Sequence, residues 1–153
     1  AELYRRFGGT FSVFDESMCE EVEKSSGLSA FEGHQKVIVS IDMLIKNKKY
    51  LAQILKCSWD LTIVDEAHHL EWDEWEPSAK WNSVKAISEV THGLLLLTAT
   101  PRQRGVGSQF GLLNLIDPHR FHDFSNFIEE LKSIKRVGEC AKALLSSSYP
   151  HEF

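Results

Sequence analysis

Cysteine is scarce in this chain, and its few copies form no recognisable pattern. The three cysteines, Cys19, Cys57 and Cys140, are odd in number and far apart, and no Cys-x-x-Cys occurs. Their spacing excludes a disulfide framework and a zinc ribbon, and it is typical of a reduced compartment. No apolar run approaches the roughly twenty residues of a membrane span, and the amino end carries acidic and arginine residues where a signal peptide would be apolar. We expect a cytoplasmic protein without membrane association.

An excess of positive charge is also missing. The 17 lysine and arginine residues are outnumbered by 22 aspartate and glutamate residues, which leaves a net charge of −5. A dedicated nucleic-acid-binding module needs a basic face that supplies most of the affinity, so the charge argues against such a module. It does not exclude one lobe of a motor that holds nucleic acid in a cleft between two lobes. With 153 residues, 42% of them hydrophobic, the chain can form one core, and a second complete domain is not expected.

Two short apolar runs that end in polar residues are the most informative feature present. Leu61–Val64 leads into Asp65-Glu66-Ala67-His68-His69, and Leu94–Leu97 leads into Thr98-Ala99-Thr100-Pro101. Such runs are typical of buried parallel strands, whose carboxyl ends open into a ligand crevice. Chemistry is therefore expected where the apolar runs stop.

Adjacent carboxylates after a strand can have different roles, because their side chains point in different directions. The pattern predicts that Asp65 holds the Mg²⁺ that bridges the terminal phosphates of a nucleotide, as in the Walker B arrangement. Glu66 is the candidate general base that positions the attacking water. His68 is expected to form hydrogen bonds toward Thr98 and Thr100, because short hydroxyl side chains both donate and accept them.

Two other interpretations of these residues stay open. An Asp-Glu pair after a hydrophobic strand is often only the start of a solvated loop. A metal hydrolase built on Asp65, Glu66, His68 and His69 is the rival enzyme, although the chain lacks the His-Glu-x-x-His spacing that places two imidazoles on one helical face.

The alternation of apolar runs with helical patterns predicts an α/β fold, with a parallel sheet and helices on both faces. The expected strands are Phe11–Phe14, Val37–Ser40, Leu61–Val64 and Leu94–Thr98. The expected helical or irregular segments are a surface helix and loop over Asp15–Gly33, a helix over Ile41–Leu55, a shorter helix over Trp81–Val90, a flexible turn over Gly105–Gly111, two helices over Phe124–Leu145 that break near Gly138, and a frayed tail over Ser146–Phe153.

Clusters of tryptophan and histidine have weaker interpretations. Trp72, Trp75 and Trp81 lie among acidic residues, where base stacking is electrostatically poor, so packing against the fold or a partner protein is favoured. His119 and His122 have a spacing that could bind a metal, but a structural role beside the Asp-Pro helix end is favoured.

Three motifs together resemble a known family. The Asp-Glu-Ala-His box is followed by Leu-Leu-Thr-Ala-Thr-Pro and then by the segment Gln109–Phe121, which contains Phe110-Gly111-Leu112-Leu113-Asn114-Leu115-Ile116-Asp117-Pro118. This order is similar to the first motor lobe of Swi/Snf-type superfamily-two ATPases, and the likeness covers nearly the whole chain. Within the family it is most similar to the bacterial branch that associates with RNA polymerase.

The resemblance implies a partial RecA-like (P-loop NTPase) lobe over residues 1–123, with the start of a helical insertion and a frayed tail over 124–153. It implies ATP and Mg²⁺ as cofactors, and DNA and RNA polymerase as partners. His68, Thr98 and Thr100 would couple hydrolysis to movement. Ser40 is similar in position to a nucleic-acid contact of the family, although a helix cap is an equal interpretation. Another superfamily-two motor, such as a chromatin-type remodeller or a restriction translocase, and a non-catalytic polymerase-docking module stay as alternatives.

One expected part is absent from the sequence. No Gly-x-x-x-x-Gly-Lys-Ser/Thr occurs, so the chain lacks the loop and lysine that cradle nucleotide phosphates. We therefore expect the isolated chain to be inactive. We also expect Leu94–Leu97 to form a sheet edge that pairs with another copy or is covered by the carboxyl-terminal segment.

Overall fold

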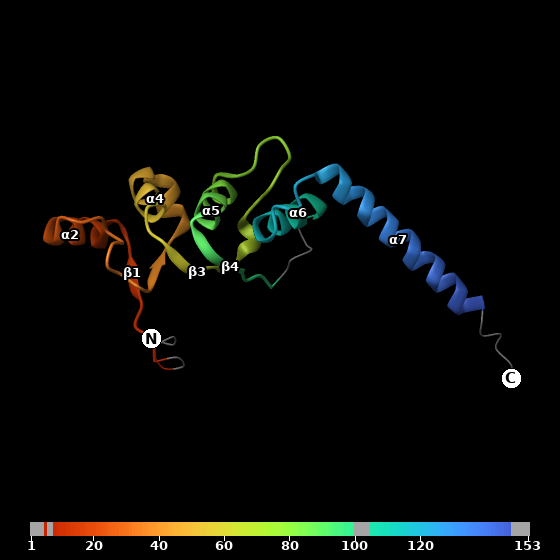
Figure 1. Cartoon of the computed structure of the whole chain (residues 1–153), viewed down its shortest axis with the longest axis horizontal. Coiled ribbons are helices and arrows are strands. Elements are labelled where there is room, and N and C mark those ends of the chain that lie inside the picture. The colour runs from red at the N-terminus through yellow and green to blue at the C-terminus, as the bar shows by residue number, and fades with distance from the viewer. Residues whose placement is uncertain (1–4, 6–7, 100–104, 148–153) are drawn as a thin grey trace.

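The computed structural model describes residues 5, 8–99 and 105–147 (Figure 1). Strands and helices alternate along these residues, as the α/β interpretation requires. The elements are β1 (Ser12–Phe14), α2 (Glu16–Ser26), β2 (Val37–Val39), α3 (Ile41–Lys46), α4 (Lys48–Ile54), β3 (Trp59–Val64), the 3₁₀ helix η1 (Ala67–His69), α5 (Ala79–Glu89), β4 (Thr91–Leu96), α6 (Gly105–Ile116) and α7 (Phe124–Ser147). No helix in the described ranges is both long and apolar enough to cross a bilayer.

The strands form two parallel pairs, which confirms the predicted α/β class. β1 pairs with β2, and β3 pairs with β4 in the register Leu61 to Gly93 and Val64 to Leu96. Parallel neighbours need a crossover connection, and α5 supplies it between β3 and β4. The register brings the carboxyl ends of β3 and β4 to the same edge of the sheet.

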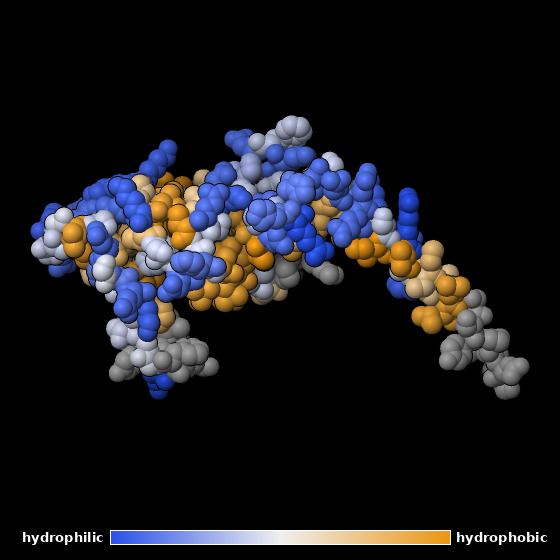
Figure 2. Space-filling model, in the orientation of Figure 1, coloured by the Kyte–Doolittle hydropathy of each residue, from blue (hydrophilic) through white to orange (hydrophobic). Residues whose placement is uncertain are grey.

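The described helices cover only one face of the strands, which differs from the expectation of helices on both faces. Figure 1 shows α4 and α5 on one side of β3 and β4. The side chains on the opposite side are apolar but open to solvent, and Figure 2 shows hydrophobic surface along this lower side of the body. They are Val13, Ile38, Leu61, Ile63, Leu95 and Leu97, between 39% and 66% exposed. Strands with apolar residues on both faces are typical of sheets buried on both sides, so this face is suited to being covered.

The buried faces of the strands pack into two hydrophobic clusters. The first joins α2, α3 and α4 to β1 and β2 around Phe31, Leu44 and Cys19, all below 3% exposed. The second joins η1, α5 and α6 to β3 and β4 around Ala67 and Leu70. Burial of whole apolar side chains contributes about 1.5–3 kcal/mol each, so the second cluster fixes the segment that follows β3.

Two helix boundaries differ from the sequence-based predictions. The single helix predicted over Ile41–Leu55 is divided at Asn47, whose φ of −121° and ψ of 88° are not helical. Asparagine is a weak helix former, and the break lets Leu44 in α3 and Tyr50 in α4 both reach the first cluster. The predicted break near Gly138 is wrong, because α7 is one helix from Phe124 to Ser147. The cost of one internal glycine, about 1 kcal/mol, is too small to end it.

The segment Gly105–Gly111, predicted as a flexible turn, is the first part of α6. The tail prediction falls partly outside the described residues, since Ser146 and Ser147 belong to α7 and residues 148–153 are not described.

β4 has a strand partner only on the β3 side among the described residues. Because α7 runs away from β4 in Figure 1, the described carboxyl-terminal segment does not cover that edge; pairing with a second copy stays a prediction.

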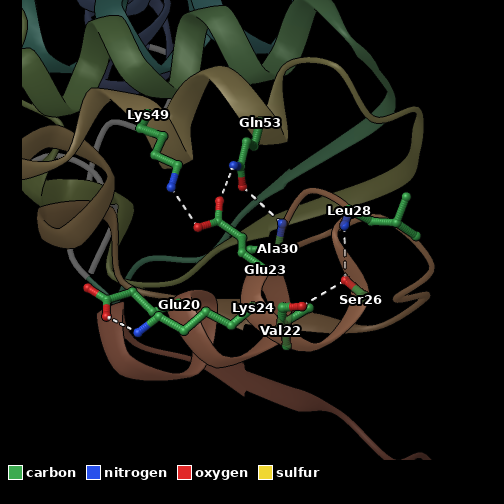
Figure 3. Close-up of polar contacts among 9 residues, drawn as sticks. All are labelled: Glu20, Val22, Glu23, Lys24, Ser26, Leu28, Ala30, Lys49 and Gln53. Atoms are coloured by element: carbon green, nitrogen blue, oxygen red, sulfur yellow. Dashed lines mark hydrogen bonds and ion pairs between the residues drawn. The ribbon is translucent and has the colours of Figure 1, made fainter.

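A polar contact joins α2 to α4 at the surface (Figure 3). The carboxylate of Glu23 accepts hydrogen bonds from Lys49 at 2.6 Å and from the side-chain amide of Gln53 at 2.5 Å. Gln53 in turn accepts a 3.0 Å bond from the backbone N–H of Ala30. The hydrogen bond from Lys49, followed by that from Gln53, lowers the pKa of Glu23 from its ordinary value of 4.5, because both favour the ionised carboxylate.

Glu23 should make this chain sensitive to acid. Its folded-state pKa is lowered, so the stability it contributes is present above pH 4.5 and is lost as the pH falls through the lower folded value. We expect Glu23→Gln to be less stable than wild type at neutral pH and to lose less stability on acidification. Thermal unfolding between about pH 7 and pH 3, in the range that spans ordinary carboxyl pKa values, measures this difference. The exposed Glu89→Gln is the control, and equal pH dependence of all three proteins would contradict the prediction.

Candidate nucleotide-hydrolysis site

The acidic pair follows β3 directly, in a backbone turn that few residues adopt. Glu66 has φ 51° and ψ 44°, the left-handed conformation, and no other described residue apart from glycine has a positive φ. The Asp65 carboxylate supports the turn, because its Oδ1 accepts a 2.9 Å hydrogen bond from the Glu66 N–H. Non-glycine residues in this conformation are uncommon and cluster at functional sites. The two carboxylates that the sequence places side by side therefore have different partners, because the Glu66 carboxylate contacts His68 instead.

Backbone hydrogen bonds at the carboxyl ends of β3 and β4 hold this turn next to the second polar segment, which begins at Thr98. The N–H of Leu97 donates to the Val64 carbonyl at 2.8 Å, and the N–H of Ala67 donates to the Leu97 carbonyl at 2.8 Å. Ala67 is fully buried and Leu70 is 2% exposed. The Asp-Glu-Ala-His box is therefore anchored to the residue that precedes Thr98.

His68 lies between Glu66 and Thr98. Its Nδ1 is 3.0 Å from Glu66 Oε2 and 3.5 Å from Thr98 Oγ1, and its side chain is 21% exposed. A neutral imidazole nitrogen either donates or accepts. A proton on Nδ1 would be donated to Glu66, whereas a bare Nδ1 would accept from the Thr98 hydroxyl. The ring therefore links the two segments in a way that depends on its tautomer.

The ring of His69 stacks on His68 rather than joining the polar contact. The two ring centroids are 4.1 Å apart. The backbone N–H of His69 bonds to the Glu66 carbonyl at 2.9 Å. Within residues 5, 8–99 and 105–147, no group of three histidine, cysteine or acidic side chains is arranged to hold a metal ion. This leaves the rival metal hydrolase on Asp65, Glu66, His68 and His69 without a ligand cluster among the described residues.

Asp65 has the chemistry expected of a magnesium ligand. It lies directly after the end of β3 and is exposed, and Mg²⁺ is usually bound by one or two carboxylates together with substrate phosphates and water. A single carboxylate at this place fits that pattern, and the remaining ligands would come from phosphates and water.

The remaining predicted site residues are not brought into this contact. Thr100 lies outside the described residues. Ser40 follows β2 and occupies the N-cap position of α3, with an extended backbone but no side-chain capping bond. Its exposed hydroxyl is therefore compatible with either interpretation made from the sequence. His122 Nδ1 lies 2.9 Å from the carbonyl of His119, a local contact that agrees with the structural interpretation of this pair.

The structure separates the three tryptophans, which the sequence could not do. Trp72 packs its ring against Phe110 and Phe124, with centroids 4.7 and 5.1 Å apart. Trp81 is 6% exposed and donates its indole N–H to the Gly111 carbonyl at 2.9 Å. Trp75 is 88% exposed. Trp72 joins the segment after the box to α6 and α7, whereas Trp81 joins α5 to α6.

The parallel strand ends, the acidic turn and the threonine segment define a partial RecA-like lobe of the helicase-like class. The sequence family described as the SNF2-related domain matches residues 17–147, and the chain belongs to this family. The predicted Swi/Snf resemblance is therefore confirmed.

Two relatives share most of the chain. It is 46% identical over 145 residues to RNA polymerase-associated protein RapA of Photobacterium profundum, covering 95% of this chain and 15% of that protein. It is 41% identical over 148 residues to RNA polymerase-associated protein RapA of Cronobacter sakazakii, covering 97% of this chain and 15% of that protein. The chain thus spans about a seventh of the length of each, and it is a RapA-like segment of the SNF2-related family.

Proposed function

We propose that this chain is part of an ATP-dependent nucleic-acid translocase of the RapA type. The observation that carries the proposal is the contact of Glu66, His68 and Thr98 at the carboxyl ends of two parallel strands, where α/β proteins bind ligands. In this proposal residues 1–123 belong to the ATP-binding lobe, and residues 124–153 start a helical insertion. The start of α7 at Phe124 supports that boundary.

Each site residue has a distinct role in the proposal. Asp65 would hold Mg²⁺, which neutralises charge that develops on the transferred phosphoryl group. Glu66 would orient the attacking water and accept its proton. His68 and Thr98 would couple the protonation of the Glu66 carboxylate to the segment after β4 through their hydrogen bonds, and Thr100 would take part in the same coupling. Movement of the second polar segment would then follow hydrolysis, since both segments share backbone hydrogen bonds.

The partners proposed are DNA and RNA polymerase. The relatives are named as RNA polymerase-associated, and Ser40 is the proposed nucleic-acid contact on this chain. The three free cysteines agree with a reduced cytoplasmic setting. Another superfamily-two motor and a non-catalytic docking module on polymerase are the alternatives, and they predict different nucleotide behaviour.

Calorimetry with Mg·ATP tests the proposal. We expect no binding to the 153-residue chain, because its sequence has no phosphate-binding loop, and binding to a polypeptide extended toward the amino terminus. Hydrolysis by the longer polypeptide should rise on addition of duplex DNA. If the longer polypeptide binds no nucleotide, the resemblance is one of fold alone and the docking module replaces the motor.

A further inference from the structure

The segment between η1 and α5 presents one tryptophan to solvent. Figure 1 shows this segment projecting beyond the helices on the side away from the strands. Trp75 is 88% exposed, more than any other large hydrophobic side chain in the described ranges. Exposed tryptophan is costly to leave in water, and it is among the residues most enriched at the centres of protein interfaces.

Local hydrogen bonds hold the backbone at Trp75 in place. Asp73 Oδ1 accepts from the backbone N–H of Trp75 at 3.0 Å and from that of Glu76 at 3.4 Å. The N–H of Ser78 donates to the Glu71 carbonyl at 3.1 Å and closes the base of the segment. Trp72 anchors it to the body through Phe110 and Phe124. Because the turn is already ordered, its backbone loses little conformational entropy on binding.

An acidic hollow lies beside the tryptophan. It has a volume of about 370 Å³ and is lined by Glu71, Trp72, Asp73, Glu76, Ser78 and Ser108. Across the described part of the chain, no lysine or arginine forms an ion pair with Asp73, Glu74 or Glu76. The nearby Lys80 pairs with Asp42 at 2.7 Å instead. Glu71 has an interaction of its own, so the carboxylates that suit the hollow to a lysine or arginine side chain from another molecule are those of Asp73 and Glu76.

We propose that Trp75 and this acidic hollow form a docking surface for a partner protein that offers an apolar pocket next to exposed lysine or arginine. The inference rests on the proposed function and takes the partner to be RNA polymerase. Trp75 would fill the pocket, and a basic side chain of the polymerase would enter the hollow. Nucleic acid is a poor match, because phosphates would meet Asp73, Glu74 and Glu76.

Titration of purified core RNA polymerase with the full polypeptide that contains this chain tests the inference. Trp75→Ala should raise the dissociation constant about thirtyfold, the effect of removing an interface hot spot. Glu76→Lys should slow association and reduce its dependence on salt, as expected for a charge at an interface rim. Leu28→Ala, which removes a different 53% exposed apolar side chain, is the matched control and should bind like wild type. ATP hydrolysis should be unchanged in all three variants.

The outcomes separate the docking surface from the proposed function. Wild-type affinity of both Trp75→Ala and Glu76→Lys would overturn the docking surface and leave the motor intact. Failure of the wild-type polypeptide to bind polymerase would overturn the proposed partner and the inference together, while nucleotide hydrolysis would still test the motor. Self-association that is lost in Trp75→Ala, with polymerase binding unchanged, would assign the surface to a second copy and overturn the polymerase proposal.

Discussion

Glu66→Gln is expected to lower kcat for ATP hydrolysis by about 10²–10⁴-fold, the usual contribution of a general base. The change keeps the size and the hydrogen-bonding reach of the side chain but removes its ability to accept a proton. Affinity for Mg·ATP should remain, because Asp65 is the proposed magnesium ligand. Steady-state hydrolysis and calorimetric binding, measured on the polypeptide that contains the whole nucleotide site, check both halves of the prediction.

The control for Glu66→Gln is Glu74→Gln, which neutralises an exposed carboxylate outside the contact with His68. It should hydrolyse ATP at the wild-type rate. If Glu66→Gln also hydrolyses ATP at the wild-type rate, Glu66 is not the general base, and the interpretation of the Asp-Glu pair as the start of a solvated loop is favoured. If Glu66→Gln instead loses nucleotide binding, the carboxylate serves to position the loop rather than to activate water.

The second large effect is expected at Gly111, where α6 meets the tryptophans. A Cβ built on Gly111 would lie 2.6 Å from Trp72 Cγ and even closer to its Cβ, and the carbonyl of the same residue accepts the Trp81 indole N–H. Gly111→Ala should therefore destabilise the 153-residue chain by about 1–3 kcal/mol, the usual cost of overpacking. This corresponds to roughly 2–10 °C in Tm for a chain of this length, measured by circular dichroism on heating.

Gly138→Ala provides a matched control in which the same substitution should have the opposite sign. A Cβ there meets nothing within 4 Å, and the residue lies inside α7, where alanine is favoured over glycine by about 1 kcal/mol. We expect a small gain in stability. If Gly111→Ala were as stable as wild type, the close packing of Trp72 on α6 would be wrong.

Much of the candidate site follows from local sequence. Apolar runs before Asp65 and Thr98 predict adjacent strand ends, and the observed pairing of β3 with β4 places Thr98 Oγ1 3.5 Å from His68 Nδ1. The carboxyl ends of two paired parallel strands lie at the same edge of the sheet, whatever the rest of the fold is. The left-handed turn at Glu66 has no sequence signal of its own, since glycine or asparagine is the residue expected in that conformation.

Three wrong predictions have different physical causes. The apolar spacing over Ile41–Leu55 is compatible with one helix, and only contacts of Leu44 and Tyr50 with the same cluster require the break at Asn47. Glycine at 138 weakens a helix by too little to end α7. The prediction of helices on both faces rested on strands that are apolar on both sides. Such strands show that both faces are suited to burial, but they do not show which segments cover them.

By itself the sequence determined the α/β class, the family and the choice of candidate site residues, because strand patterns and motifs depend on neighbours along the chain. Only the tertiary structure decided which of three similar tryptophans packs and which is presented. Trp72 and Trp81 are covered by residues of α6, whereas Trp75 is 88% exposed. The physical reason is that burial is set by contacts between segments distant in sequence, and no local pattern of residues contains them.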